Sequence, residues 1–155
     1  MHSRTLVVVA FAVVVLALTG TVPSGAAVVD VGQIKVSKGT VHIERAKQRV
    51  PVTVGTVVQE GDVLITGADG SAGITFKDDS LLSVGPDSVL AIDRFAFDST
   101  THAGAFETSL RQGTMAAVSG KIAKASPDAM RVRTPATILG VRGTEFVVRS
   151  SRVAP

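Results

Sequence analysis

Residues 57–88 read VVQEGDVLITGADGSAGITFKDDSLLSVGPDS, and this stretch decides the fold class. Short apolar runs within it alternate with polar residues at a period of two, as in Ala72-Gly73-Ile74-Thr75-Phe76. Turn formers stand between the runs, for example Asp69-Gly70 and Gly85-Pro86-Asp87. Gly accepts a positive φ, Asp bonds its own backbone and Pro fixes φ, so each site favours a tight turn. The stretch therefore predicts short strands joined by turns.

The same pattern continues on both sides. Further strands are expected at 34–36, 40–44, 50–54, 105–110, 114–118, 130–134 and 144–149. No window keeps a helical period, and the best helix candidate, Met115 to Lys124, is interrupted by Ser119-Gly120. Turn signals at intervals of roughly 8–12 residues are typical of sandwiches, barrels and β-solenoids. We predict an all-β fold, a short irregular β-solenoid or β-roll of about ten to twelve short strands, with a β-sandwich as the alternative.

The N-terminus predicts export. An apolar, uncharged run over 5–18 follows Arg4 and precedes the small residues Ser24-Gly25-Ala26, which together form the three parts of a secretory signal peptide. A spanning helix needs about 20 apolar residues, so we expect cleavage, a periplasmic location and no membrane span afterwards. An uncleaved inner-membrane anchor is the alternative. The predicted division of the chain is a signal peptide (1–26), a lead-in (27–33), an all-β domain (34–149) and a C-terminal tail (150–155).

Composition excludes several classes of function. The chain has no Cys, Trp or Tyr, which removes disulfides, thiolate nucleophiles and most platforms on which a base or a sugar could stack. Its charge falls into three blocks, net positive over 28–58, net negative over 59–110 and net positive over 111–155. A nucleic-acid binder would concentrate positive charge on one face, so we expect no nucleic-acid partner. We expect instead that the oppositely charged blocks lie close together in the fold.

A search for reactive side chains finds no chemistry. His42 alternates with apolar neighbours on a strand and His102 stands in a loop, and neither accompanies a Gly-x-Ser-x-Gly nucleophile motif. The acidic turn at Asp78-Asp79 lacks the spacing of a calcium loop. We therefore predict no enzyme activity, no catalytic residue, no cofactor and no metal. His42, His102, Asp78 and Asp79 are all expected at the surface.

Two motifs in order resemble a known family. Residues 57–88, together with Arg133 to Val148 (RTPATILGVRGTEFVV), resemble the two signatures of FecR-type domains, the periplasmic sensing modules named after the iron-dicitrate regulator. Leu110-Arg111-Gln112-Gly113 is similar to the Leu-x-x-Gly of the same family. Asp79 stands where the family usually has Gly, and Asp tolerates a positive φ better than most residues do. The resemblance covers roughly Ile34 to Arg149, nearly all of the predicted mature chain.

The resemblance implies an all-β module whose motif residues shape the fold rather than perform chemistry. The expected structural motif residues are Gly61, Asp62, Thr66, Asp78, Asp79, Ser80, Pro86, Gly113, Thr134, Pro135, Gly143, Thr144 and Phe146. The side chains expected to fill the core are Val63, Ile65, Ile74, Phe76, Leu82, Val84, Val89, Ile92 and Phe146.

In full-length sensors of this kind the domain relays the occupancy of an outer-membrane transporter to a cytoplasmic anti-sigma segment. We expect this chain to be free-standing, because neither a cytoplasmic region before Thr5 nor a further domain after Pro155 is present in the sequence. The resulting hypothesis is a non-catalytic sensing or protein-interaction module of the cell envelope, of unspecified oligomeric state, that binds an unknown protein partner through strand edges or loops. The alternative is a module that binds a cell-wall glycan or a metal complex through its acidic middle.

Overall fold

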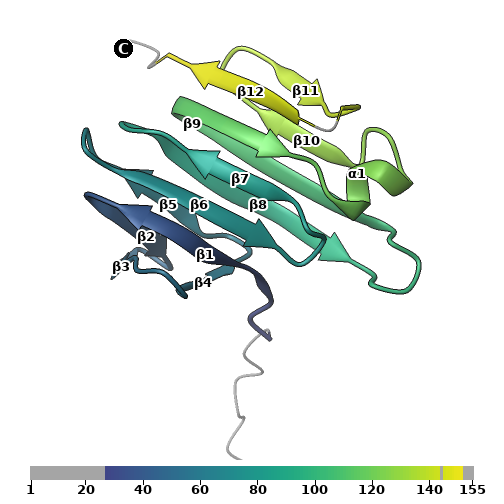
Figure 1. Cartoon of the computed structure of the whole chain (residues 1–155), viewed down its shortest axis with the longest axis horizontal. Helices are drawn as coiled ribbons and strands as arrows, with labels where there is room; N and C mark the ends of the chain where they lie inside the picture. Colours follow the sequence, from purple (N-terminus) through teal and green to yellow (C-terminus); the bar gives the residue numbers. More distant parts are fainter. Residues whose placement is uncertain (1–26, 144, 152–155) are drawn as a thin grey trace, which may run out of the picture.

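The structure is a computed structural model, and it describes residues 27–143 and 145–151 (Figure 1). The predicted signal peptide, Thr144 and residues 152–155 of the predicted tail lie outside the described residues. In the described part no helix is long and apolar enough to cross a membrane.

Twelve strands and one short helix make up the described fold, which confirms the all-β class. The elements are β1 (Asp30–Lys38), β2 (Val41–Arg45), β3 (Gln48–Pro51), β4 (Val57–Gln59), β5 (Val63–Thr66), β6 (Ser71–Phe76), β7 (Leu81–Val84), β8 (Val89–Phe97), β9 (Gly104–Val118), α1 (Lys121–Ala125), β10 (Met130–Arg133), β11 (Ile138–Gly140) and β12 (Glu145–Ser150). The first strand thus begins inside the predicted lead-in. The helix candidate at 115–124 is divided, since β9 continues to Val118 and α1 begins only at Lys121, after Ser119-Gly120.

All strands belong to one sheet that curls into a half-barrel. Its order is β3-β2-β5-β8-β9-β7-β6-β1-β4, with β10 and β12 both paired to β9 and β11 paired to β10. In Figure 1 the long green β9 runs through the middle, with β12 and β11 above it and β1 to β4 at the lower left. Among the described strands only the β9–β10 pair is parallel. The coils of a parallel β-solenoid stack through parallel strand pairs, whereas nearly all pairs here are antiparallel. The strand pairing therefore does not support the solenoid that the sequence predicted.

Strand β9 divides the sheet into two halves. Its C-terminal part pairs with β7 and β12, which together with β6, β1 and β4 form half A. Its N-terminal part pairs with β8 and β10, which together with β5, β2, β3 and β11 form half B. The inner faces of the two halves meet in one core. Phe76 of half A packs against Phe95 and Phe106 of half B, with ring centroids 5.6 and 4.5 Å apart.

A register shift between Leu110 and Gln112, followed by the left-handed Gly113, lets one strand serve both halves. Phe106 and Leu110 are buried before it, whereas Met115 and Ala117 are buried after it, so the inward positions change from even to odd. Gly113 has φ +97°, a left-handed conformation that L side chains rarely adopt. Its hydrogen faces Ser88, and a Cβ there would lie 2.0 Å from Ser88 Oγ. The Leu-x-x-Gly motif therefore marks the crossing from half B into half A.

The prediction of which residues fill the core was partly wrong, because some strands turn the other set of alternate residues inward. Ile74, Phe76, Leu82, Val84 and Ile92 are buried as predicted. The remaining predicted core residues are only half-buried, and they are Val63, Ile65, Val89 and Phe146. Their neighbours Leu64 and Leu90 point inward instead. In the apolar run 63–65 the reason is that the flanking polar residues Asp62 and Thr66 are themselves buried. Because alternate residues of a strand share a face, Leu64 then points inward, and Val63 and Ile65 point outward.

Candidate interaction surface

The first family motif closes the turn before β5 with a buried carboxylate. Asp62 is 1% exposed and accepts hydrogen bonds from Arg45 Nε at 2.8 Å, Arg45 Nη2 at 2.7 Å and Gln59 N at 2.9 Å. Arg45 Nη2 also donates to Val57 O at 2.9 Å. The hydrogen bond to Asp62 raises the pKa of the Arg45 guanidinium. This pair ties β2 to the β4–β5 turn.

The buried hydroxyl groups of Thr66 and Ser88 join the end of β5, the Gly85-Pro86 turn and β9. Thr66 Oγ1 donates to Gly85 O at 2.7 Å and accepts from Ser88 N at 2.9 Å. Ser88 Oγ donates to Pro86 O at 2.9 Å and accepts from Thr114 N at 3.1 Å. Because these hydroxyl groups bond backbone on three segments, they connect the Gly-Pro turn to the bulge of β9.

The acidic turn at Asp78-Asp79 is a further correction. Asp78 was expected at the surface, but it is 0% exposed and accepts from Ser80 N and Ser80 Oγ at 3.1 and 2.8 Å. Ser80 Oγ in turn accepts from Gly120 N at 2.9 Å. Asp79 is exposed, has φ +64°, and forms an ion pair with Lys121 at 2.8 Å, which lowers the pKa of Asp79. The turn therefore holds the segment between β9 and α1.

The closing motif forms a separate turn. Thr134 Oγ1 accepts from Ala136 N and Thr137 N at 3.3 and 3.1 Å, and Pro135 stands exposed inside this turn. Gly143 is exposed and Phe146 is half-buried on β12. The polar contacts of the described motif residues thus run to backbone, to serine hydroxyl groups, and to the side chains of Arg45 and Lys121. The motifs do not converge on one pocket.

The histidines do not form a reactive group. His42 is half-buried rather than on the surface, and its Nε2 is buried without a partner among the described residues. His102 is exposed, as expected, and stacks on Phe97 with ring centroids 6.2 Å apart. Within 27–143 and 145–151, no three His, Asp or Glu side chains gather in a way that could hold a metal ion.

The outer face of half A carries no charge over β6, β7 and the C-terminal part of β9. Cross-strand register aligns Val147, Ala116, Ser83 and Gly73 in one row, and Val118, Leu81 and Thr75 in the next, where Glu145 of β12 stands at the end of the row. Val147 is 67% exposed and Leu81 is 46% exposed, so large apolar side chains face solvent here. We call this the uncharged face, and it comprises Val36, Gly73, Thr75, Leu81, Ser83, Ala116, Val118 and Val147.

The outer face of half B has the opposite character. Arg133 pairs with Glu107 at 3.1 Å across β10 and β9, and other charged side chains surround them. Exposed or half-buried charged residues of this half include Glu44, Arg49, Asp93, Arg94, Glu107, Arg131 and Arg133. A face of charged side chains stays solvated, whereas an uncharged face with protruding apolar groups gains by being covered. Of the two outer faces, that of half A is therefore the better candidate for an interaction surface.

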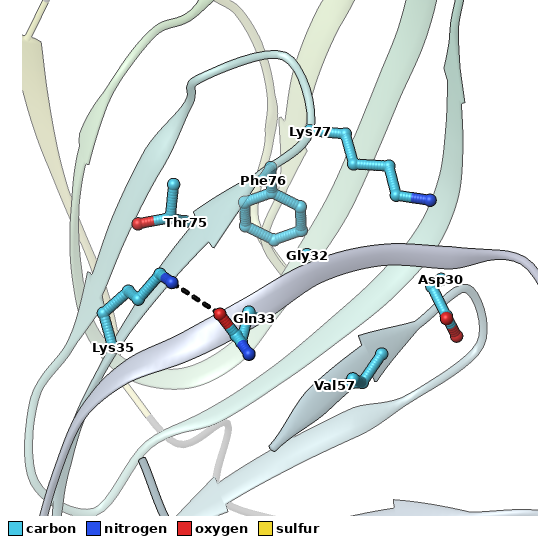
Figure 2. A pocket seen from close by; sticks show the side chains of 8 residues that line it. All are labelled: Asp30, Gly32, Gln33, Lys35, Val57, Thr75, Phe76 and Lys77. Atoms are coloured by element: carbon cyan, nitrogen blue, oxygen red, sulfur yellow. Dashed lines mark hydrogen bonds between the residues drawn. The ribbon is translucent and has the colours of Figure 1, made fainter. Parts of the chain in front are cut away.

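A hollow of about 320 Å³ lies beside the uncharged face, between β1, β4 and β6 (Figure 2). Gly32 and Phe76 line it, and a Cβ at Gly32 would lie 2.7 Å from Thr75 O, so glycine allows the close approach of β1 to β6. In Figure 2, Lys35 meets Gln33, while Lys77 and Asp30 extend away from the Phe76 ring. Ligand pockets usually present convergent polar groups, and the labelled groups here do not converge.

Most of the sheet falls within the range of one known protein family. The family described as FecR protein matches residues 62–154. The chain belongs to the FecR protein family. No curated protein and no solved structure matches the chain. FecR is a regulatory and sensor family of cell-envelope signalling, which agrees with the resemblance expected from the two motifs.

The FecR match begins at Asp62, the residue that Arg45 holds in the β4–β5 turn. Strands β1 to β4 precede the matched range, yet β1 pairs with β6 and β2 pairs with β5. The N-terminal strands and the FecR match therefore fold as one sheet.

The charge blocks of this FecR domain compensate as expected. Three of the four ion pairs among the described residues join the negative middle of the chain to a positive flank: Arg45–Asp62, Lys121–Asp79 and Arg133–Glu107. The sequence pattern predicted this proximity, but it missed the uncharged face. The signal that could have found it is the run of small or uncharged residues at alternate positions of 71–84 and 114–118.

The fourth ion pair predicts a pH effect. Arg142 hydrogen-bonds to Asp128 at 3.0 Å and lowers the pKa of Asp128 below its usual 3.8. A lowered pKa stabilises the fold above the unfolded-state value, and that stabilisation is lost as the pH falls through the folded-state value. We expect Asp128→Asn to be less stable than wild type at about pH 7, and the difference to shrink as the pH falls below 3.8.

Urea unfolding of both proteins across this pH range measures the effect. A difference that stays constant as the pH falls well below 3.8 would contradict the role of the ionised Asp128–Arg142 pair, since protonation makes the carboxyl neutral like the amide.

Proposed function

We propose that this FecR domain is an exported, periplasmic and non-catalytic sensing module that binds a protein partner of the cell envelope through the uncharged face. The family supports the coarse part of this proposal, because FecR domains are periplasmic and act in envelope signalling. The N-terminal pattern of Arg4, an apolar run over 5–18 and small residues supports export.

The uncharged face is the observation that carries the proposal. Single exposed apolar residues are ordinary, but here several stand together on adjacent strands that place no charged side chain between them. Small side chains at Gly73, Ser83 and Ala116 keep the face flat, so another surface can approach it closely. Interfaces between proteins are depleted of charge at their centre, as this face is.

The buried polar residues support the non-catalytic part. The side chains of Asp62, Asp78 and Ser80 form hydrogen bonds with backbone groups and with Arg45. These bonds lie inside the fold and away from the uncharged face. We interpret the described FecR motif residues as structural, since most of them close or flank a turn, Gly113 allows β9 to cross between the halves, and Phe146 packs against the core. A catalytic carboxylate would need to reach a substrate, and these two are buried.

A charge placed on the uncharged face tests the proposal. We expect Ser83→Glu to reduce capture of envelope proteins by the full chain at least tenfold, because an unpaired carboxylate would be buried in the interface. Ser83 is exposed between buried Leu82 and Val84, so the substitution leaves the core untouched. The measurement is quantitative mass spectrometry of proteins captured from membrane and periplasmic extracts.

The matched control is Ser99→Glu, an equally exposed serine in the loop after β8. Capture that falls with Ser83→Glu and persists with Ser99→Glu supports the proposed face. Equal capture by all three proteins, with equal unfolding midpoints, would refute it.

A further inference from the structure

The described sheet ends in four edge strands, and β12 is the longest of them. β3, β4 and β11 are edges of four, three and three residues, and β3 ends in Pro51, which has no N–H to donate. β12 has six residues, contains no proline and, among the described strands, pairs with β9 alone. Long edges without proline or inward charge pair readily with another strand.

The side chains of β12 are complementary to a second copy of the same strand. Val147 stands at the centre of the outward positions, with Glu145 two residues before it and Arg149 two residues after it. Neither Glu145 nor Arg149 forms an ion pair or a side-chain hydrogen bond within the described part of the chain. On β9 they face the uncharged residues Val118 and Thr114.

Two-fold symmetry restricts how two β12 strands can pair. In an antiparallel pair, residues directly opposite each other share a face, so outward positions must meet outward positions. When Val147 lies opposite its own copy, Glu145 lies opposite Arg149 of the second copy, and Arg149 lies opposite the second copy's Glu145. A shift to the neighbouring allowed register would place Glu145 or Arg149 opposite Val147 and lose both charge pairs.

From this complementarity we infer that two copies of the chain associate through antiparallel pairing of their β12 edges, with Val147 on the two-fold axis. Opposite charges directly across a strand pair stabilise it, and like charges destabilise it. Half A then continues from one copy into the next, with two Glu145–Arg149 pairs and the two Val147 side chains between the two uncharged faces. On the inner side, half-buried Phe146 of each copy lies opposite Val148 of the other, at the mouth of an apolar hollow of about 290 Å³.

Charge reversal tests the pairing and its register together. We expect the full chain, purified from the cells that produce it, to sediment with twice the molar mass of one chain. Arg149→Glu or Glu145→Arg alone places like charges opposite each other twice, and should weaken dimerisation at least tenfold. The double variant Glu145→Arg with Arg149→Glu restores opposite pairs and should restore the dimer.

Lys124→Glu is the control, because Lys124 is exposed on α1 and lies outside β12. Circular dichroism checks that every variant keeps its fold. A monomeric wild type would overturn the inference, and so would a dimer that tolerates both single reversals. Loss of the dimer in the double variant would overturn the proposed register. None of these results depends on the envelope partner, so the inference fails or stands apart from the proposed function.

Discussion

Gly113→Ala is expected to destabilise the fold by about 3–5 kcal/mol, combining a strained φ with overpacking. The new Cβ would lie 2.0 Å from Ser88 Oγ and 2.5 Å from Ser88 Cα, and Gly113 holds φ +97°. Ser88 cannot move away freely, because its Oγ accepts from Thr114 N and donates to Pro86 O. Urea unfolding measures the loss, and failure to accumulate folded protein would be the extreme form of the same result.

A second glycine separates the two causes. Gly55 has φ +96°, and a Cβ there meets no atom within 4 Å. Gly55→Ala therefore carries the dihedral strain without the clash, and should cost only about 1–2 kcal/mol. If both substitutions destabilise the protein equally, the close approach of β9 to Ser88 does not matter for stability.

Arg45→Met is expected to cost about 3 kcal/mol, because it leaves the buried Asp62 carboxylate without its ionic partner. Asp62 would keep only the bond from Gln59 N, and Val57 O would lose its donor. The measurement is the free energy of unfolding at neutral pH. Arg49→Met is the control: Arg49 is an exposed arginine on the adjacent β3, and its loss should change stability by no more than about 0.5 kcal/mol.

A second substitution tests the reason for the loss. Adding Asp62→Asn to Arg45→Met removes the buried charge and keeps an acceptor for Gln59 N, so part of the lost stability should return. A double variant that is less stable than Arg45→Met would show that the methionine fails for steric reasons, and not because a charge is left buried.

The two FecR motifs and the turn residues could be predicted from local sequence patterns. Alternation in 72–76 and 81–84 placed Ile74, Phe76, Leu82 and Val84 in the core, and the blocks of opposite charge predicted the ion pairs between them. These features are local, or depend only on composition. Asp79 is an example, since Asp is among the few residues that tolerate its φ of +64°.

Burial of Asp78 could not be predicted in the same way. An acidic pair in a turn is ordinarily solvated, and the sequence does not show that Gly120, some 40 residues later, brings its N–H to Ser80. A buried carboxylate that accepts nearby N–H and O–H groups replaces the water it loses. Both donors to the Asp78 carboxylate belong to Ser80, only two residues later. What is non-local is the segment after β9, whose Gly120 and Lys121 N–H groups bond Ser80 Oγ and Asp78 O.

Sequence alone determined the all-β class, the family and most of the turns, because a period of two and the φ preferences of Gly, Asp and Pro act within a few residues. The tertiary structure decided which side of the run Val63-Leu64-Ile65 faces inward, since three consecutive apolar residues carry no alternation. It also decided that β9 crosses between halves next to Gly113, and that the uncharged residues of five strands meet on one face. Strand register depends on which distant segments pair, and that information is non-local.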